Sequence, residues 1–293
     1  MTLPIVEKVK KITVLHFNPN YIDDEYFFNK FKYSPLLSGL FHSPLSGIGL
    51  KFLRNKLSRN YRHQIAWSNH FVLLSDLFRT TLNDLLPEGY DYRKVISINN
   101  PLVIDYDFKL DKPKKEKIVL YVGRIDNGFK NVDKLIRAWA RIAPHVPDWK
   151  FLICGNGGEF EEDKQLIQDE HIPRCEMLGV VNPTDYYKCA SVIVMASSAS
   201  EGWGMVLVEA QQYGCVPIVL NSYASIRDII QNTINGILVE KNSNWQEIFS
   251  NQLLNLLLDK EGREQMMYNA IYSAHRYDIN NIGQQWLKLI NEQ

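Results

Sequence analysis

Two glutamates flank a glycine-rich turn whose residue types suit the binding of a phosphorylated sugar. Glu201 opens the turn, and Glu209 lies roughly a turn and a half into a predicted helix over residues 205–213. Glycines let a backbone approach a ligand closely, and the free amides of a helix start attract anions. A carboxylate beside a phosphate is useful where hydroxyl groups donate to it, as the sugar and ribose of a nucleotide-sugar can. Glutamates that merely interact with the helix dipole are the alternative, which the pair alone does not exclude.

Two cations lie six positions apart in a second loop. Gly123 and Arg124 follow an apolar run, and Lys130 precedes a helix predicted from about residue 132. Arginine can bind an oxyanion through two N–H groups and lysine adds a point charge, so the pair suits a diphosphate. Two solvated surface cations explain this loop equally well when it is taken alone.

Strands and helices alternate regularly in the second half of the chain, which predicts a parallel sheet covered on both faces. Ligands of such α/β sheets bind at the carboxyl ends of the strands. The loops expected there are 123–130, 155–158 and 197–204. The predicted strands cover residues 117–122, 149–154, 175–178, 191–195 and 216–220, and further helices cover 160–168 and 183–189.

The first hundred residues are less regular. Strands are predicted over 12–16, 71–74 and 95–98, helices over 50–66 and 77–86, and a linker over 102–116. The tail predicts an amphipathic helix with Ile282, Trp286 and Ile290 on one face. We therefore expect a donor-side domain over 113–277 and a partial domain over 1–112, onto which the helix 278–293 packs back.

Bulk composition excludes several classes of protein. Lysines plus arginines equal aspartates plus glutamates, 33 against 33 in 293 residues, so no global field attracts nucleic acid. The sequence shows neither a signal peptide nor an apolar run long enough to span a bilayer. The four cysteines are scattered, which predicts free thiols in a reducing cytoplasm and no zinc site.

The order of the motifs carries more information than any one of them. VGRI with Lys130, then ICGNG, LG, the Glu201–Glu209 segment and NGILV follow one another across residues 119–239. This half resembles the donor-binding domain of retaining GT-B glycosyltransferases of the family 4 type, the glycosyl transferases group 1. The resemblance implies an α/β, GT-B-like fold with a complete Rossmann-like C-terminal domain and a partial Rossmann-like N-terminal domain.

The resemblance also implies roles for individual residues. Arg124 and Lys130 would bind the donor diphosphate, Glu201 the hydroxyls of the transferred sugar, and Glu209 the ribose. His16, which ends the first strand, is similar to a histidine beside the family's reaction centre, although a structural histidine is an equally good interpretation. The remaining residues implied in donor binding are Gly123, Gly155, Met177, Leu178, Gly179, Gly202, Trp203, Gly204, Met205 and Val206; those at 177–179 would face the base and the backbone of 204–206 the phosphates.

The implied function is a cytoplasmic hexosyltransferase-type enzyme of polysaccharide biosynthesis. It would transfer a sugar from a nucleotide-sugar, with UDP or GDP as the nucleotide, to a saccharide or lipid-linked acceptor, with retention and without a metal or cofactor. A non-catalytic nucleotide-sugar-binding remnant or partner subunit is the main alternative, and a GT-B epimerase is another.

Two further expectations concern partners. The family's acceptor domain usually begins with a strand and a glycine-rich loop and has on the order of 150 residues, whereas about 110 precede the linker here. We therefore expect a truncated N-terminal domain and either self-association or a partner chain over its exposed edge. The second expectation is a basic helix that could contact an anionic membrane, for which a solvated surface helix is the favoured alternative. Its basic residues are Lys51, Arg54, Lys56, Arg59, Arg62 and His63.

Overall fold

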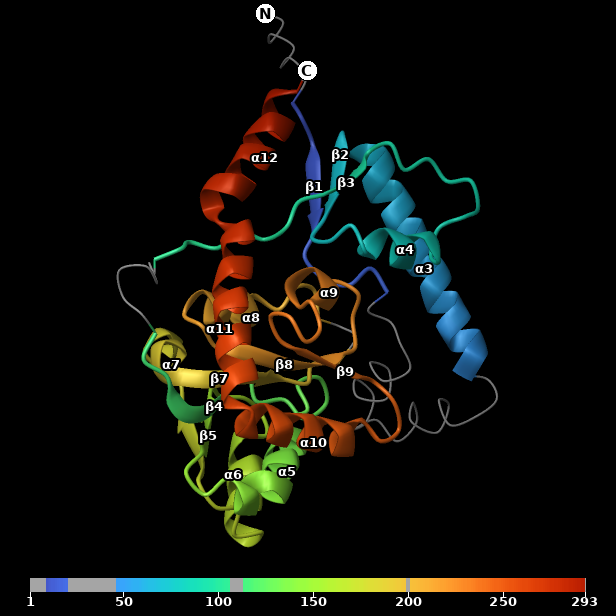
Figure 1. Ribbon diagram of the computed structural model, residues 1–293. Helices are drawn as coiled ribbons and strands as arrows, with labels where there is room; N and C mark the ends of the chain where they lie inside the picture. The colour runs from blue at the N-terminus through green and yellow to red at the C-terminus, as the bar shows by residue number, and fades with distance from the viewer. Residues whose placement is uncertain (1–8, 21–45, 106–112, 199–200, 293) are drawn as a thin grey trace, which may run out of the picture.

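The computed structural model describes residues 9–20, 46–105, 113–198 and 201–292, and they form two parallel sheets with their helices (Figure 1). The central part of the predicted linker, residues 106–112, and Ser200 lie outside the described residues. On either side of that gap, strand and helix types agree with the sequence prediction. The predicted α/β fold is confirmed.

The larger sheet has six strands in the order β6-β5-β4-β7-β8-β9, and all neighbours are parallel. The chain builds outward from β4 in one direction, then returns to start β7 on the other side of β4. This reversal is the topological switch point at which doubly wound sheets bind ligands. The strands are β4 (Glu116–Val122), β5 (Lys150–Cys154), β6 (Cys175–Gly179), β7 (Ala190–Met195), β8 (Val216–Asn221) and β9 (Ile237–Glu240).

Helices cover both faces of this sheet, and the central strands are accordingly apolar on both faces. In β4, Ile118 and Leu120 belong to one core and Val119 and Tyr121 to the other. Helices α5 and α10 pack together on one face, and α7 packs with α8 on the opposite face. The helices are α5 (Val132–Ile142), α6 (Phe160–Asp169), α7 (Pro183–Cys189), α8 (Met205–Gln212), α9 (Ile226–Ile229), α10 (Trp245–Leu258) and α11 (Lys260–Ala274), with 3-10 turns at Ala143–His145 and His275–Tyr277.

The smaller sheet has three parallel strands in the order β1-β2-β3. Its strands are β1 (Ile12–Leu15), β2 (His70–Leu73) and β3 (Val95–Ser97), and two helices, α3 (Ser46–Trp67) and α4 (Phe78–Asn83), lie beside it. Helix α3 buries Leu57, Tyr61 and Ile65 against the sheet, where the Tyr61 ring meets Phe71 edge-on at 6.1 Å. The spacing of four residues between these side chains places them on one face of the helix.

The C-terminal helix α12 (Ile279–Asn291) covers the other face of the smaller sheet, as Figure 1 shows. Ile282 and Leu289 are buried there with Val72 and Ile98. The predicted apolar face is therefore wrong at one position, because Ile290 is 55% exposed. Residues seven apart return to nearly the same side of a helix, so Leu289, and not Ile290, faces the sheet with Ile282.

The two connections between the sheets run side by side. Leu102 donates its amide to Tyr277 and accepts from the amide of Ile279, at 2.6 and 2.8 Å. One core then continues from the smaller sheet into the larger one. The carboxyl ends of β1 and β3 are thereby held near the carboxyl ends of β4 and β7.

Candidate functional site

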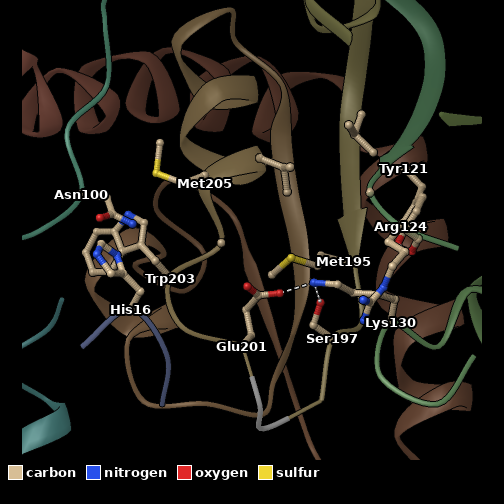
Figure 2. A pocket seen from close by; sticks show the side chains of 14 residues that line it. His16, Asn100, Tyr121, Arg124, Lys130, Met195, Ser197, Glu201, Trp203 and Met205 are labelled. Atoms are coloured by element: carbon tan, nitrogen blue, oxygen red, sulfur yellow. Dashed lines mark hydrogen bonds and ion pairs between the residues drawn. The ribbon is translucent and has the colours of Figure 1, made fainter. Parts of the chain in front are cut away.

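A pocket of about 300 Å³ opens at the switch point, beyond the carboxyl ends of β4 and β7 (Figure 2). Both sheets contribute to it, because the residues after β1 and β3 form part of the wall. The lining consists of His16, Asn100, Tyr121, Val122, Gly123, Arg124, Lys130, Met195, Ser197, Glu201, Trp203, Gly204, Met205 and Val206.

The loop after β4 is shaped by its own polar residues. The Asp126 carboxylate accepts from the amides of Gly128 and Phe129, at 3.1 and 2.9 Å. Asn131 takes a left-handed conformation with φ 54° and donates its amide group to the carbonyl of Ala196 at 2.7 Å. This bond ties the end of the loop to the end of β7. Lys130, which precedes Asn131, consequently lies at the floor of the pocket.

Lys130 is the centre of the polar cluster in the pocket. Its ammonium forms an ion pair with the Glu201 carboxylate and donates to Ser197 Oγ at 3.3 Å (Figure 2). The two charged side chains are only 25% and 20% exposed, so water screens the pair less than it screens surface pairs. An ammonium has three N–H groups, and one of them has no partner within the described part of the chain. That N–H is available to an anionic ligand.

Arg124 lies at the rim of the same cluster. Its guanidinium is 63% exposed and pairs with Asp126 at 2.7 Å. Its backbone carbonyl accepts from the buried Tyr121 hydroxyl at 2.8 Å. Burial, followed by the charges of Glu201 and Asp126, raises the pKa of Tyr121 far above its usual range, so this phenol stays neutral. The tyrosine fixes the backbone of the loop, while the exposed guanidinium could exchange Asp126 for a ligand.

The start of α8 supplies backbone donors opposite Lys130. Gly204 precedes the helix with φ 87°, a conformation that favours glycine, and a Cβ there would come within 2.8 Å of the Tyr223 hydroxyl. No side chain caps the helix, and no acidic residue occupies its first turn. The first amides of a helix have no partners within it, so the amides near Met205 and Val206 could bind an anion.

The remaining wall of the pocket comes from the smaller sheet and Trp203. Figure 2 shows His16 and Asn100 close to Trp203, on the side of the pocket away from Lys130. Trp203 is buried and meets the Tyr277 ring edge-on at 5.4 Å. A Cβ on Gly202 would lie 2.2 Å from the carbonyl oxygen of His16, so a glycine is needed for this contact between the two parts of the chain.

Six of the predicted site residues do not line this pocket. Gly155 packs against the backbone of Gly123, where an added Cβ would lie 1.8 Å from the Gly123 carbonyl oxygen. Glu209 lies deeper in α8 and accepts a hydrogen bond from Tyr187. Gly202 packs against the backbone of His16. Met177, Leu178 and Gly179 are partly exposed at the end of β6, where Gly179 accepts from the amide of Gly155 at 2.7 Å.

Sequence reasoning missed five residues of the pocket wall, namely Asn100, Tyr121, Val122, Met195 and Ser197. Tyr121, Val122 and Met195 belong to strands whose apolar character suggested only core positions. Ser197 and Asn100 follow strand ends, and that position was a usable signal. Polar residues just beyond the carboxyl ends of parallel strands converge on the ligand edge.

The sequence pattern of the glycosyl transferases group 1 matches residues 104–272, which is more than half of the chain. The chain belongs to this family. The matched region contains both motif loops and the start of α8, and it ends before α12. This family membership also confirms the group 1 resemblance on which the site assignment was based.

Several glycosyltransferases are similar to this chain in sequence. The amylovoran biosynthesis glycosyltransferase AmsD of Erwinia amylovora is 31% identical over 70% of this chain and 58% of its own. An α-1,4-N-acetyl-D-galactosaminyltransferase of Campylobacter jejuni, which acts on an undecaprenol diphosphate-linked saccharide, is 29% identical over 68% of this chain and 55% of its own. An uncharacterised glycosyltransferase of Haemophilus influenzae is 29% identical over 80% and 65%. The chain thus spans less than two thirds of the length of these relatives.

Solved glycosyltransferase structures share the fold. A Staphylococcus aureus TarM variant bound to UDP superimposes with a TM-score of 0.72 at 20% identity, over 97% of this chain and 51% of that chain. HepE of Anabaena, bound to UDP-glucose, gives 0.67 at 18% identity, over 95% and 71%. At these identities the likeness concerns the fold alone, and it confirms the GT-B-like arrangement.

None of the described helices is both long and apolar enough to cross a bilayer. Among the same residues, no group of three or more His, Cys, Asp or Glu side chains is placed to hold a metal ion.

Proposed function

We propose that this chain transfers a sugar from a nucleoside diphosphate sugar to an acceptor hydroxyl. The observation that carries the proposal is the pairing of Lys130 with Glu201 and Ser197, opposite the uncapped start of α8. Such a cluster offers a cation and backbone donors to a diphosphate and a carboxylate to sugar hydroxyls. Residues 113–277 would form the donor domain, and residues 1–112 with the helix 278–293 the acceptor side.

In this proposal the pocket acts on the leaving group. The bond between the anomeric carbon and the phosphate oxygen breaks, and its electron pair stays on the nucleoside diphosphate. Lys130, Arg124 and the amides near Met205 stabilise the charge that develops there, a contribution worth about 10²–10³-fold in rate for each well-placed donor. Because these groups supply the positive charge, we propose that no metal is required and expect EDTA to leave transfer unchanged.

We propose that the anomeric configuration is retained. Glu201 is the sole carboxylate among the described residues that line the pocket, and it is already paired with Lys130. A double displacement needs a free carboxylate as nucleophile, so attack from the face of departure is favoured, with the leaving phosphate taking the proton of the acceptor hydroxyl. Proton NMR of the first product formed would distinguish retention from inversion.

We propose a saccharide or lipid-linked acceptor of cytoplasmic polysaccharide biosynthesis. Two relatives support this, because AmsD is named for amylovoran biosynthesis and the Campylobacter jejuni enzyme acts on an undecaprenol diphosphate-linked saccharide. His16 and Asn100 would face this acceptor. Both side chains lack hydrogen bonds within the described part of the chain, and His16 is exposed. They can therefore donate to or accept from an incoming hydroxyl.

We also propose that α3 contacts an anionic membrane that carries the acceptor. The helix has five lysines and arginines and no acidic residue in 22 positions, and Phe52 on its outer side is 68% exposed. Each cation near such a surface contributes about 1 kcal/mol. The variant Lys56→Glu/Arg59→Glu should lose sedimentation with phosphatidylglycerol vesicles, whereas Lys260→Glu on α11 should keep it. Equal binding of all three proteins, or equal binding to phosphatidylcholine, would contradict membrane contact through α3.

A partner over the smaller sheet is a further part of the proposal. Among the described strands, β1 pairs only with β2, so its other edge can accept a strand of a second copy or of another chain. Analytical ultracentrifugation over a range of concentrations tests self-association, and a monomer at the highest concentration would contradict it.

Titration calorimetry with UDP and GDP tests the donor site itself. Lys130→Ala should weaken nucleotide binding about 10- to 100-fold, the range expected for loss of a hydrogen bond to a charged group. Lys117→Ala is the control, because the Lys117 side chain is 57% exposed and pairs with Asp148, outside the pocket. Equal affinities for the parent and Lys130→Ala would overturn the site assignment. Binding without transfer or sugar interconversion would instead identify a non-catalytic donor-binding protein.

A further inference from the structure

Tyr187, on α7, contacts Glu209, the second glutamate of the Glu201–Glu209 segment. Its hydroxyl donates to Glu209 Oε2 at 3.1 Å, and its side chain is almost completely buried. The other carboxylate oxygen of Glu209 has no hydrogen-bond partner in the described part of the chain. One oxygen of Glu209 is thus held by the protein while the other is left to a ligand.

Tyr187 is itself fixed from three directions. Its backbone carbonyl accepts from Lys115 Nζ at 2.8 Å, and Cys215 Sγ lies 3.2 Å from the same oxygen. Its ring stacks on that of Tyr213, with centroids 6.3 Å apart and planes 19° from parallel. The two contacts at the carbonyl hold the backbone, and burial with the stacked ring leaves the phenol little freedom, so the carboxylate must adapt to the phenol.

The chemistry of the contact suits a permanent donor. Burial, followed by the negative charge of Glu209, raises the pKa of Tyr187 far above its usual range, so the hydroxyl keeps its proton. A carboxylate accepts about four hydrogen bonds, and Tyr187 takes one of them. A glutamate held in one rotamer also loses less conformational entropy when a ligand binds than a free one would.

We propose that Tyr187 is a positioning residue that presents the Glu209 carboxylate to the ribose hydroxyls of the donor nucleotide. The inference rests on the proposed function, in which Glu209 binds the ribose. Tyr187 does not line the pocket, so its effect on the nucleotide passes through Glu209. Recognition of ribose would then depend on a hydroxyl that the ligand never touches.

Calorimetry with UDP and GDP, each compared with its 2′,3′-dideoxy analogue, tests this role. The dissociation constant of the dideoxy analogue divided by that of the natural nucleotide measures ribose recognition. This ratio cancels effects on the phosphate and base sites. In Tyr187→Phe we expect the natural nucleotide to bind about tenfold more weakly, a typical loss for a hydrogen bond to a charged group, and the dideoxy analogue to bind as in the parent. The ratio therefore falls about tenfold. On a Glu209→Ala background, Tyr187→Phe should change neither constant.

Tyr213→Phe is the matched control. It alters the partner ring of the stack and removes the 2.5 Å bond to Asp105, but leaves the Glu209 contact in place, so the parent ratio should persist. A Tyr187→Phe protein with the parent ratio, or one that weakens natural and dideoxy nucleotides equally, would overturn the positioning role alone. If the parent chain binds neither UDP nor GDP, the proposed donor site fails and the role of Tyr187 fails with it.

Discussion

The two sides of the pocket differ in how firmly their side chains are held. On the donor side, Lys130 is bonded to Glu201 and Ser197, and Tyr121 fixes the carbonyl of Arg124. On the other side, His16 and Asn100 have no side-chain hydrogen bonds within the described residues, and they follow short strands of a three-stranded sheet. In our proposal, the side with Lys130 is preorganised for the donor diphosphate, whereas the side with His16 leaves its polar groups to the acceptor.

The largest effect is expected where the loops after β4 and β5 touch each other. Gly155→Ala would place a Cβ 1.8 Å from the carbonyl oxygen of Gly123, and both positions are backbone that cannot easily move. We expect a loss of more than about 4 kcal/mol in the free energy of unfolding, measured by urea denaturation, together with weaker nucleotide binding. Gly158→Ala is the control, because nothing lies within 4 Å of its added Cβ. Similar stability of the two variants would show that the loops are not tightly packed.

The next prediction concerns the smaller sheet and its helix α12. Ile282→Ala should cost about 2–4 kcal/mol of unfolding free energy, because a buried side chain is lost and a cavity remains. Ile290→Ala should change it by less than about 0.5 kcal/mol, since that side chain is 55% exposed. Thermal and urea unfolding measure both. Equal costs would mean that α12 packs with a different face, and the acceptor side would lose its structural basis.

A pH prediction sharpens the description of the donor loop. Burial raises the pKa of Asp163, which accepts from Asn127 in that loop, to about 6 from 3.8. The folded chain therefore favours the protonated acid. This stabilisation is complete below pH 4 and is lost as the pH rises through 6. Over this interval the free energy of unfolding of the parent should fall by about 1–3 kcal/mol, whereas that of Asp163→Asn should not fall. Urea unfolding at several pH values would measure both. Parallel pH profiles of the parent and Asp163→Asn would contradict the assignment.

The smallest effect is expected on the acceptor side. His16→Ala should lower transfer about tenfold, the loss expected for one hydrogen bond to an acceptor hydroxyl, while the affinity for UDP or GDP stays within twofold. Radiolabelled sugar transfer and nucleotide calorimetry measure the two quantities separately. A fall in nucleotide affinity without a change in transfer would place His16 on the donor side and contradict its proposed role.

The sequence predicted the larger sheet well because its signals are local. The strand and helix patterns from β4 to β8 are long, apolar and separated by glycines, and α7 begins at Pro183 and ends at Cys189, as its sequence indicates. The motif loops could also be placed, because parallel strands bring their carboxyl ends to one edge. The roles given to Lys130, Glu201 and the others stay predictions.

Features that depend on contacts between distant segments could not be predicted. Gly155 lies in a glycine-rich segment typical of a ligand-binding loop, but it packs against the backbone of Gly123. The contact between Tyr187 and Glu209 joins two helices and has no sequence signature of its own. On α12 the buried residue is Leu289 and not the predicted Ile290. The rotation of the helix about its axis decides between them, and only its packing against the smaller sheet determines that rotation.

A crystal structure of the full chain with UDP or GDP bound tests the central claim most directly. We predict phosphate oxygens within about 2.7–3.2 Å of Lys130 Nζ and of the amide nitrogens near Met205, with the ribose against Glu209. A nucleotide bound elsewhere, for example in the polar hollow lined by Arg227, Asp228 and Arg276, with the Lys130–Glu201 pocket left without phosphate, would contradict it.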